Sequence, residues 1–420
     1  MKARVLSVGA AIWLLSAAGA MATEAKGVIK TYADIAAAMY ADSLQSAEAL
    51  HQSVVAFTAA PTEENLQAAR AAWVAARVPY QQTEGLRFGN SIVDEWEGRV
   101  NAWPLDEGLL DYVAPAYGDS SDENPAYTAN LVANETLQLG GQTIDASVIT
   151  KDLLSGSLHE VLGVEANVAT GYHAIEFLLW GQDLNGTGPG AGARPATDFD
   201  PKNCSNGHCE RRAALLNVLT GLLVDDLTEM ADAWAPGGAA RLALLEKTEA
   251  EGLVTILTGL GSLSYGELAG ERIKLGLLLH DPEEEHDCFS DNTHNSHYYN
   301  QVGMVSLYTG SYRRIDGSAI QGPSMADFAG EKAPEAHQSL NALMVDTLAR
   351  MQVMKDTADS GKMAYDQMIG EGNDAGNKII RDVVDGLVAQ TRGIERVVAA
   401  LDLDISVEGS DSLDNEAAVQ

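Results

Sequence analysis

Residues 32–57, YADIAAAMYADSLQSAEALHQSVVAF, carry the pattern that decides the fold class of this chain. Apolar side chains recur every three or four residues along this stretch, which is the period of an α-helix with one buried face. The same period runs through residues 66–88, 211–234, 240–263, 336–354 and 377–401. Because few segments alternate as strands do, the sequence predicts an all-α protein with helical-bundle packing.

Two glycine- and proline-rich loops, residues 178–199 and 307–328, resemble each other. Each runs from an apolar helix end through a glycine stop to a closing Asp-Phe pair. This likeness suggests a divergent internal duplication with a division near residue 205. We therefore expect two helical-bundle-like halves, one over residues 23–204 and one over 205–404. The acidic, small-residue-rich tail over 405–420 is expected to be disordered.

The first 22 residues are typical of an export signal. A basic start is followed by an apolar run too short to span a membrane and by Ala20-Met21-Ala22, which predicts cleavage after Ala22. We expect a soluble periplasmic protein with no stable membrane insertion after cleavage. In that oxidising compartment Cys204 and Cys209, which enclose a turn-like loop, are expected to form a disulfide, leaving Cys288 over.

The chain is strongly acidic, with a formal net charge of −33 at pH 7. Such a charge repels nucleic acid and anionic membranes, and it draws cations toward the protein surface. It therefore argues against a nucleic-acid partner and favours a metal-related role. The need for solubility in an acidic exported protein explains the same charge, so charge alone does not decide between these readings.

The stretch Gly171-Tyr172-His173-Ala174-Ile175-Glu176 places an imidazole and a carboxylate three residues apart in an apolar, helix-forming run. On a helix, positions i and i+3 share a face, so His173 and Glu176 point the same way. Both groups are ligands for a first-row metal ion. A buried His–Glu hydrogen bond within a helix core explains the spacing equally well.

A second polar concentration lies between His280 and His297. Four of the nine histidines fall within it, together with six acidic residues. Helix capping accounts for Glu283 and Glu284, which follow Asp281 and Pro282 in a predicted first turn. Capping does not account for the histidines. The residues taken from this segment as candidate site groups are Glu285, His286, Asp291 and His294.

A third group follows one stripe of the helix predicted over residues 66–88. Two aromatic side chains share this stripe with a guanidinium and a carboxylate, which is unusual for a core face. A structural ion pair between Arg77 and Glu84 is the alternative. Downstream, Asn101 to Gly108 forms an aromatic turn able to wall a pocket. The predicted pocket-lining residues are Trp73, Arg77, Tyr80, Trp103, Asp106, Trp180 and His294.

Metallopeptidase motifs are missing from the sequence. There is no His-Glu-x-x-His, and His-x-x-Glu-His fails because Phe177 follows Glu176. A zinc hydrolase also needs a third ligand and a base, which sequence alone does not identify.

Taken together, these stretches resemble the imelysin family, most closely its iron-regulated protein A branch. The resemblance rests on Ala72-Trp73 through Phe88, on Asn101 to Gly108, on Gly171 to Glu176, and on Glu285-His286 to His294. It implies an exported bacterial protein with two helical-bundle-like halves and a site where they meet. It implies His173 and Glu176 as metal ligands, with Glu84 and the acidic-histidine segment lining the site. Family members are tied to iron uptake or classed as insulin-cleaving peptidases.

We therefore expect a periplasmic metal-binding protein that serves iron acquisition without turnover. The predicted ligands of one divalent or trivalent ion, iron before zinc, are His173, Glu176, Glu84, Glu285, His286 and Asp291. The expected partners are the metal ion or a chelate of it, and iron-transport proteins. One alternative is a metal-dependent peptidase of the imelysin type. Another is a module that binds an acidic or sugar ligand through Arg77 and the tryptophans.

Overall fold

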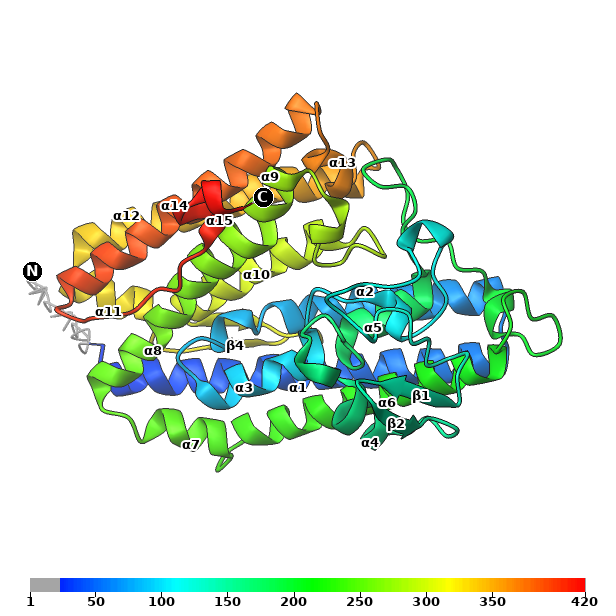
Figure 1. The fold of residues 1–420 in the computed structure, drawn as a ribbon. Coiled ribbons are helices and arrows are strands. Elements are labelled where there is room, and N and C mark those ends of the chain that lie inside the picture. Colours follow the sequence, from blue (N-terminus) through cyan, green and yellow to red (C-terminus); the bar gives the residue numbers. More distant parts are fainter. Residues whose placement is uncertain (1–22, 420) are drawn as a thin grey trace, which may run out of the picture.

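The computed structural model describes residues 23–419, and helices dominate it (Figure 1), as the all-α prediction requires. The predicted signal, residues 1–22, lies outside the described residues. The α-helices are α1 (Ala25–Ala59), α2 (Glu63–Gln81), α3 (Ser91–Asn101), α4 (Lys151–Leu153), α5 (Gly171–Trp180), α6 (Cys209–Trp234), α7 (Ala239–Leu245), α8 (Glu249–Ser262), α9 (Leu275–Leu279), α10 (Thr293–Thr309), α11 (Met325–Lys332), α12 (Pro334–Asp359), α13 (Tyr365–Ile369), α14 (Asp374–Ala400) and α15 (Asp411–Asp414). Two small antiparallel hairpins pair β1 (Thr136–Leu139) with β2 (Gln142–Asp145) and β3 (Ser311–Arg313) with β4 (Ala319–Gln321).

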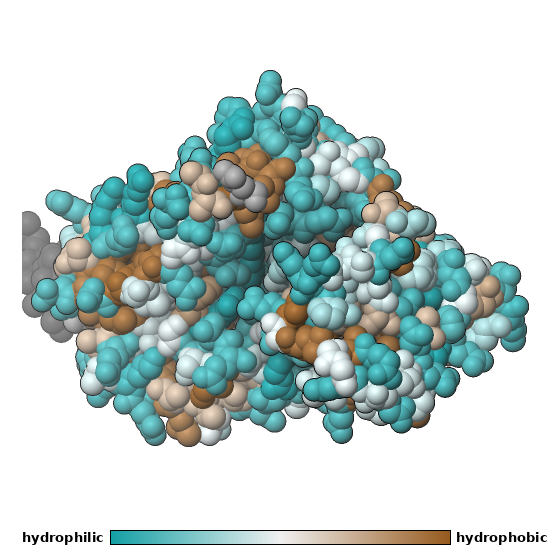
Figure 2. All heavy atoms as spheres, in the orientation of Figure 1, coloured by the Kyte–Doolittle hydropathy of each residue, from teal (hydrophilic) through white to brown (hydrophobic). Residues whose placement is uncertain are grey.

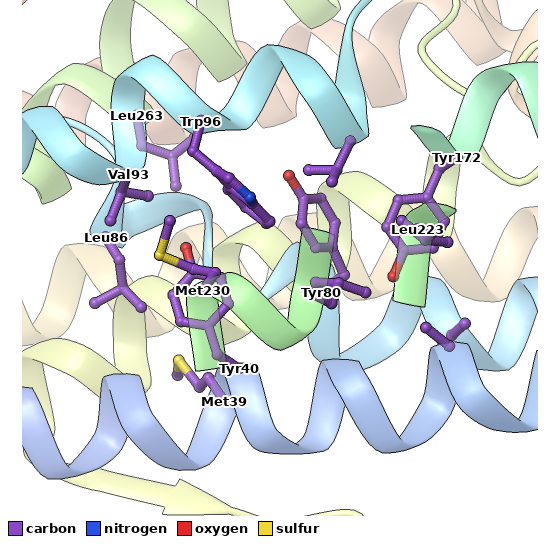
Figure 3. Packing of buried hydrophobic residues seen from close by; sticks show 14 of the residues in the cluster. Met39, Tyr40, Tyr80, Leu86, Val93, Trp96, Tyr172, Leu223, Met230 and Leu263 are labelled. Atoms are coloured by element: carbon purple, nitrogen blue, oxygen red, sulfur yellow. The ribbon is translucent and has the colours of Figure 1, made fainter. Parts of the chain in front are cut away.

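The first lobe is built around α1, which packs lengthwise against α2 and α6, while α5 packs against α2, α3 and α6. Figure 3 shows its core, where Met39 and Tyr40 of α1 face side chains of α3 and α6. The rings of Tyr40 and Trp96 meet edge to face, with centroids 5.9 Å apart. Burying these large side chains is the main driving force that holds the three helices together.

The second lobe consists of α10, α12, α14 and the π-helical segment η7 (Leu263–Lys274), with α12 packed along α14. The lobes meet where α10 packs against α2 and where α8 packs against α1. Figure 1 shows the two lobes as stacked layers, with α10 and α2 at their contact. Residues carried by α5 and by the loop before α10 lie at this contact.

One predicted helix ends earlier than expected, and another is divided in two. The helix predicted over 66–88 stops at Gln81 and gives way to a short 3₁₀ turn, η1 (Glu84–Leu86). Pro79 lies in its last turn, and because proline lacks an N–H and disturbs the preceding turn, it favours termination there. The helix predicted over 240–263 divides into α7 and α8 at Thr248, whose side chain caps α8 in a reciprocal pair with Glu251.

The acidic tail is described up to residue 419 and packs on η7, and the disorder expected for 405–420 stays a prediction. Ser410 and Ser412 are buried, and the hydroxyl of Ser412 donates a 3.0 Å hydrogen bond to the carbonyl of Gly270. A Cβ on Gly266 would stand 2.6 Å from the carbonyl oxygen of Glu408, so the tail lies directly on η7. The glycines of η7 make this close contact, which composition alone does not reveal.

The internal duplication is not confirmed. The loop over 307–328 contains the β3–β4 hairpin, whereas residues 181–195 contain no strand. Helix α6 follows residue 205 yet packs against α1 of the first lobe, and the predicted division at that residue stays a prediction. Within the described part of the chain, no helix is long and apolar enough to cross a membrane. Cys204 and Cys209 are joined by a disulfide, and Cys288 is free and buried.

Candidate metal centre

Helix α5 begins at Gly171, whose φ of +79° lies in the left-handed region that favours glycine. A Cβ at this position would stand 2.4 Å from the carbonyl oxygen of Val100, so the start of α5 packs directly on the end of α3. All ten residues of α5 are buried, and His173 and Glu176 are fully shielded from solvent. Local packing therefore fixes both side chains in the interior.

Glu176 links His173 to a loop of the second lobe. Nδ1 of His173 lies 3.1 Å from Oε2 of Glu176. The other carboxylate oxygen accepts hydrogen bonds from the backbone N–H and the hydroxyl of Ser290, at 2.9 and 2.7 Å. Nε2 of His173 has no hydrogen-bond partner, although it is buried. Glu176 is thus placed to orient the imidazole and leave one of its nitrogens free.

The loop before α10 brings His286 and Asp287 to the same place. One ring nitrogen each of His173 and His286, with one carboxylate oxygen of Asp287, all lie within 4.8 Å of one another. Nδ1 of each histidine lies 3.9 Å from Oδ1 of Asp287. Two imidazoles and a carboxylate suit a first-row divalent metal ion. We call these three residues the His/His/Asp centre.

Arg77 of α2 holds the carboxylate of this centre. Its Nη2 donates to Oδ1 of Asp287 at 2.6 Å and lies 3.4 Å from Nδ1 of His286, while Nη1 donates to Asn101 at 2.7 Å. The guanidinium is 1% exposed. It balances the charge of Asp287, and its position in the interior gives an external anionic ligand no access to it.

Burial and charge set the protonation of the centre. Burial lowers the pKa of His173 to about 3 and holds the pKa of His286 well below its ordinary value, so both rings are neutral at pH 7. Burial raises the pKa of Glu176 well above its ordinary value, with Asp287 adding to the rise. Burial would also raise the pKa of Asp287, but the charge of Arg77 brings it to about 2. Asp287 is therefore a fixed anion beside two free imidazole bases.

A cleft of about 380 Å³ reaches this centre from the surface, and His286 and Trp103 form part of its wall. In Figure 2 the surface is hollowed at the middle of the view, between the two lobes. Two arginines, Arg87 and Arg272, also line the cleft. They are outnumbered by six carboxylates: Glu97, Glu160, Glu165, Glu267, Glu271 and Glu284. The route to His286 is therefore net acidic.

Other predicted ligands lie outside the His/His/Asp centre. Glu84 accepts a 2.7 Å hydrogen bond from Arg272, because α2 ends before it and the η1 turn takes it off the Arg77 stripe. Glu285 is buried beside His286, but neither of its oxygens has a hydrogen-bond partner. Asp291 is half-buried at φ +56° and is not among the converging residues.

Of the predicted pocket residues, some lie at the His/His/Asp centre and others pack elsewhere. Trp103 faces the centre, with its ring 5.5 Å from that of His173. Three aromatic residues are packed away from the cleft. Trp73 donates to the carbonyl of Tyr172 at 3.0 Å, the ring of Trp180 meets that of Trp73 edge to face with centroids 5.4 Å apart, and the ring of Tyr80 packs 4.9 Å from that of Tyr172. Asp106 pairs with Asn124. His294 lies 3.0 Å from Asp359 of α12.

Asp287 is the site residue that sequence reasoning missed. It is one of six acidic residues in the 280–297 segment, and its spacing in the sequence does not distinguish it from the other five. Its position directly after His286 was the available signal. Asn101, which the sequence analysis places only at the start of an aromatic turn, holds the guanidinium of Arg77.

The fold and the site together define a class: a two-lobed, all-α protein with a buried His/His/Asp centre between its lobes. The sequence matches the family described as Imelysin over residues 36–394. The chain therefore belongs to the imelysin family, and the predicted resemblance is confirmed.

Named relatives refine this placement. Iron-regulated protein A of Synechococcus elongatus is 32% identical over 103 residues, which cover 24% of this chain and 27% of that protein. The match thus spans about a quarter of the relative's length. An iron-regulated protein A precursor of Parabacteroides distasonis shares the fold, with 17% identity, TM-score 0.63, and coverage of 91% of this chain and 97% of that one. An imelysin-like protein of Psychrobacter arcticum does so with 15% identity, TM-score 0.58, and coverage of 92% and 100%.

Proposed function

We propose that this imelysin-family protein binds a first-row metal cation, iron before zinc, and serves iron acquisition in the bacterial periplasm without turnover. The observation that carries the proposal is the convergence of His173, His286 and Asp287 within 4.8 Å in the interior. The donor set suits iron and zinc alike. The names of two relatives as iron-regulated proteins favour iron.

We assign each residue of the candidate centre a role that follows from its position. His173, His286 and Asp287 would hold the ion, and because both imidazoles are neutral, binding need not displace a proton from them. Glu176 would orient His173 through its contact with Nδ1, as carboxylates commonly do for metal-bound histidines. When a metal is bound, it supplies a positive charge to an interior that also holds the buried guanidinium groups of Arg77 and Arg272.

The cleft gives the cargo a route. Its carboxylate lining attracts cations and repels anions, so a free cation or a cationic chelate is the cargo we propose. The disulfide between Cys204 and Cys209 supports export to an oxidising compartment. Iron-transport proteins remain the partners that we propose.

Anaerobic titration with ferrous iron tests this assignment. We expect His173→Ala to lower the affinity at least tenfold, since one donor of the centre is lost. His208→Ala removes an exposed histidine from the start of α6 and is the matched control. Equal affinity in the wild type and His173→Ala would reject the centre.

A metal-dependent peptidase is the competing function. Its metal must receive a peptide carbonyl and a water, and His286 alone of the three donors lines the cleft. Incubation of the purified protein with an unfolded peptide, with and without chelator, separates the two functions. Chelator-sensitive cleavage that disappears in Glu176→Gln would replace our proposal with the enzyme.

A further inference from the structure

The three donors of the His/His/Asp centre differ in their access to solvent. His173 and Asp287 have no exposed surface, and neither of them lines the cleft. His286 is 2% exposed, and its ring forms part of the wall of that cleft of about 380 Å³. Its Nδ1 faces inward, 3.9 Å from Oδ1 of Asp287 and 3.4 Å from Nη2 of Arg77. The imidazole of His286 therefore stands at the boundary between the cleft and the centre.

The indole of Trp103 occupies the same boundary. Trp103 lies in the loop after α3, is half-buried, and lines the cleft together with His286. Its ring centroid is 5.5 Å from that of His173 and 6.4 Å from that of His286, and the two imidazoles are 4.6 Å apart. Rings at these separations are packed against one another, so the three close the inner end of the cleft. His173 packs against the indole without reaching the cleft, and Trp103 thus separates this donor from solvent.

The packing at the centre suits a single ion rather than an ion within a chelate. The three donor atoms lie within 4.8 Å of one another. A first-row ion binds imidazole nitrogen and carboxylate oxygen at about 2.0–2.2 Å, so one ion fills the space among them. A chelate surrounds its iron with its own donor atoms, and the close-packed interior holds few voids larger than a water molecule. An ion that reaches all three donors has therefore left its chelator behind.

Both guanidinium groups in the cleft are already paired with acids. Nη2 of Arg272 donates to Glu84 at 2.7 Å and lies 2.6 Å from Glu267, and Nε of Arg87 donates to Asp94 at 2.7 Å. Neither arginine is left to hold the carboxylates of an anionic chelator. The remaining acids of the cleft concentrate small cations instead.

We propose that the centre takes its iron as the free ferrous ion rather than as a chelate, that the ion enters along His286, and that Trp103 is the gate that sets the rates of entry and release. This inference rests on the metal binding proposed above, and it narrows the cargo to one of the two classes named there. A gate crosses the path of the ion in both directions, so its removal raises both rates by the same factor and leaves the affinity unchanged. Loss of a ligand weakens the affinity itself.

Equilibrium dialysis at about 0.15 M salt, where exposed charges are screened, tests the class of cargo. It compares free ferrous iron with the tris-phenanthroline complex of ferrous iron, which has the same charge but no open coordination position and whose red colour reports the intact complex. We expect the wild type to retain one equivalent of the free ion and His173→Ala to lose it. Retention of one equivalent of the red complex, prevented by prior loading with ferrous iron, would overturn the assignment.

The rate of iron release tests the gate, because excess phenanthroline captures each ion that leaves and turns red. Trp103→Ala should release iron roughly tenfold faster than the wild type, with an affinity within about threefold of it. Leu275→Ala removes another half-buried apolar side chain from the wall of the same cleft and is the matched control, which should release iron at the wild-type rate. Trp103→Phe keeps a smaller ring and should fall between the wild type and Trp103→Ala.

Two results would overturn the gate. One is equal release from the wild type and from an iron-binding Trp103→Ala protein. The other is an affinity that falls by the same factor as release rises, which would make the indole part of the binding site. If circular dichroism shows Trp103→Ala to be unfolded, Trp103→Phe decides between the same outcomes. A wild type that binds no ferrous iron would reject the proposed function itself, whereas iron binding with unchanged release rejects the gate alone.

Discussion

Nδ1 of His173 lies 3.9 Å from Oδ1 of Asp287, across the contact between the two lobes. Helix α5 of the first lobe carries the histidine, and the loop before α10 of the second carries the carboxylate. Neither lobe holds the donor set alone. The centre therefore exists only when α5 and that loop are packed together, which makes metal binding sensitive to the contact between the lobes.

Asp287→Asn should weaken ferrous iron binding at least tenfold, because it removes the one fixed negative charge among the three donors. Asp291→Asn makes the same chemical change in the same loop and should leave this affinity within about twofold, as Asp291 lies outside the centre. Isothermal titration under anaerobic conditions measures both. Equal losses in the two variants would return Asp291 to the ligand set and contradict the assignment.

Glu176→Gln separates an orienting residue from a ligand. Removal of a carboxylate that positions a metal-bound histidine typically costs about 10–100-fold in affinity. We expect a loss in this range that is smaller than the loss in His173→Ala. The amide can still accept from Ser290 through its oxygen, so the loop contact is retained in part. A loss as large as that of His173→Ala would make Glu176 a ligand instead.

Gly171→Ala should destabilise the protein and weaken metal binding together. The new Cβ would lie 2.4 Å from the carbonyl oxygen of Val100, at a φ of +79°. Gly372 has a similar φ of +76° with nothing within 4 Å of its Cβ position, so Gly372→Ala isolates the backbone strain of about 1–2 kcal/mol. Urea unfolding should show a larger loss for Gly171→Ala. Equal losses would show that α5 does not depend on its contact with α3.

The helical architecture was readable from the sequence because side-chain burial follows the helical period. The stretch over 32–57 lies wholly within α1. Helix ends were less readable, since apolar side chains continue past Gln81 although the backbone leaves the helix there. The contacts of the tail with η7 could not be predicted from composition, because they depend on a distant segment whose glycines leave space for the tail.

Part of the candidate site could be predicted from the sequence. His173 stood out because an imidazole and a carboxylate at i and i+3 in an apolar helix are rare, and α5 places both in the interior. The placement of Glu84 on the Arg77 stripe assumes a helix over 66–88, whereas α2 ends at Gln81 and Glu84 pairs with Arg272. Asp287 could not be singled out from the neighbouring acidic residues, because only the three-dimensional fold decides which acidic side chain in a loop turns toward His173.

The free energy of unfolding should fall as the pH falls below about 6.5. Burial lowers the pKa of His297 to about 3, whereas an exposed histidine titrates near pH ~6.5. Between these values the unfolded chain binds a proton that the folded chain excludes, so stability decreases toward acid. His297 contributes a slope of about 1.4 kcal/mol per pH unit across this window.

His297→Phe removes this titration and keeps a ring against Tyr365. Urea unfolding at a series of pH values should give the variant a shallower acid decline than the wild type, by about the slope of one histidine. His208→Phe changes an exposed histidine and should leave the slope unchanged. The same slope in all three proteins would mean that the ring of His297 is not held neutral.

The most direct test of the His/His/Asp centre is anomalous X-ray scattering from crystals grown with ferrous iron, recorded on both sides of the iron absorption edge. The account predicts a peak bounded by the side chains of His173, His286 and Asp287. A peak elsewhere, with these three side chains bonded only to protein or water at saturating iron, would contradict it.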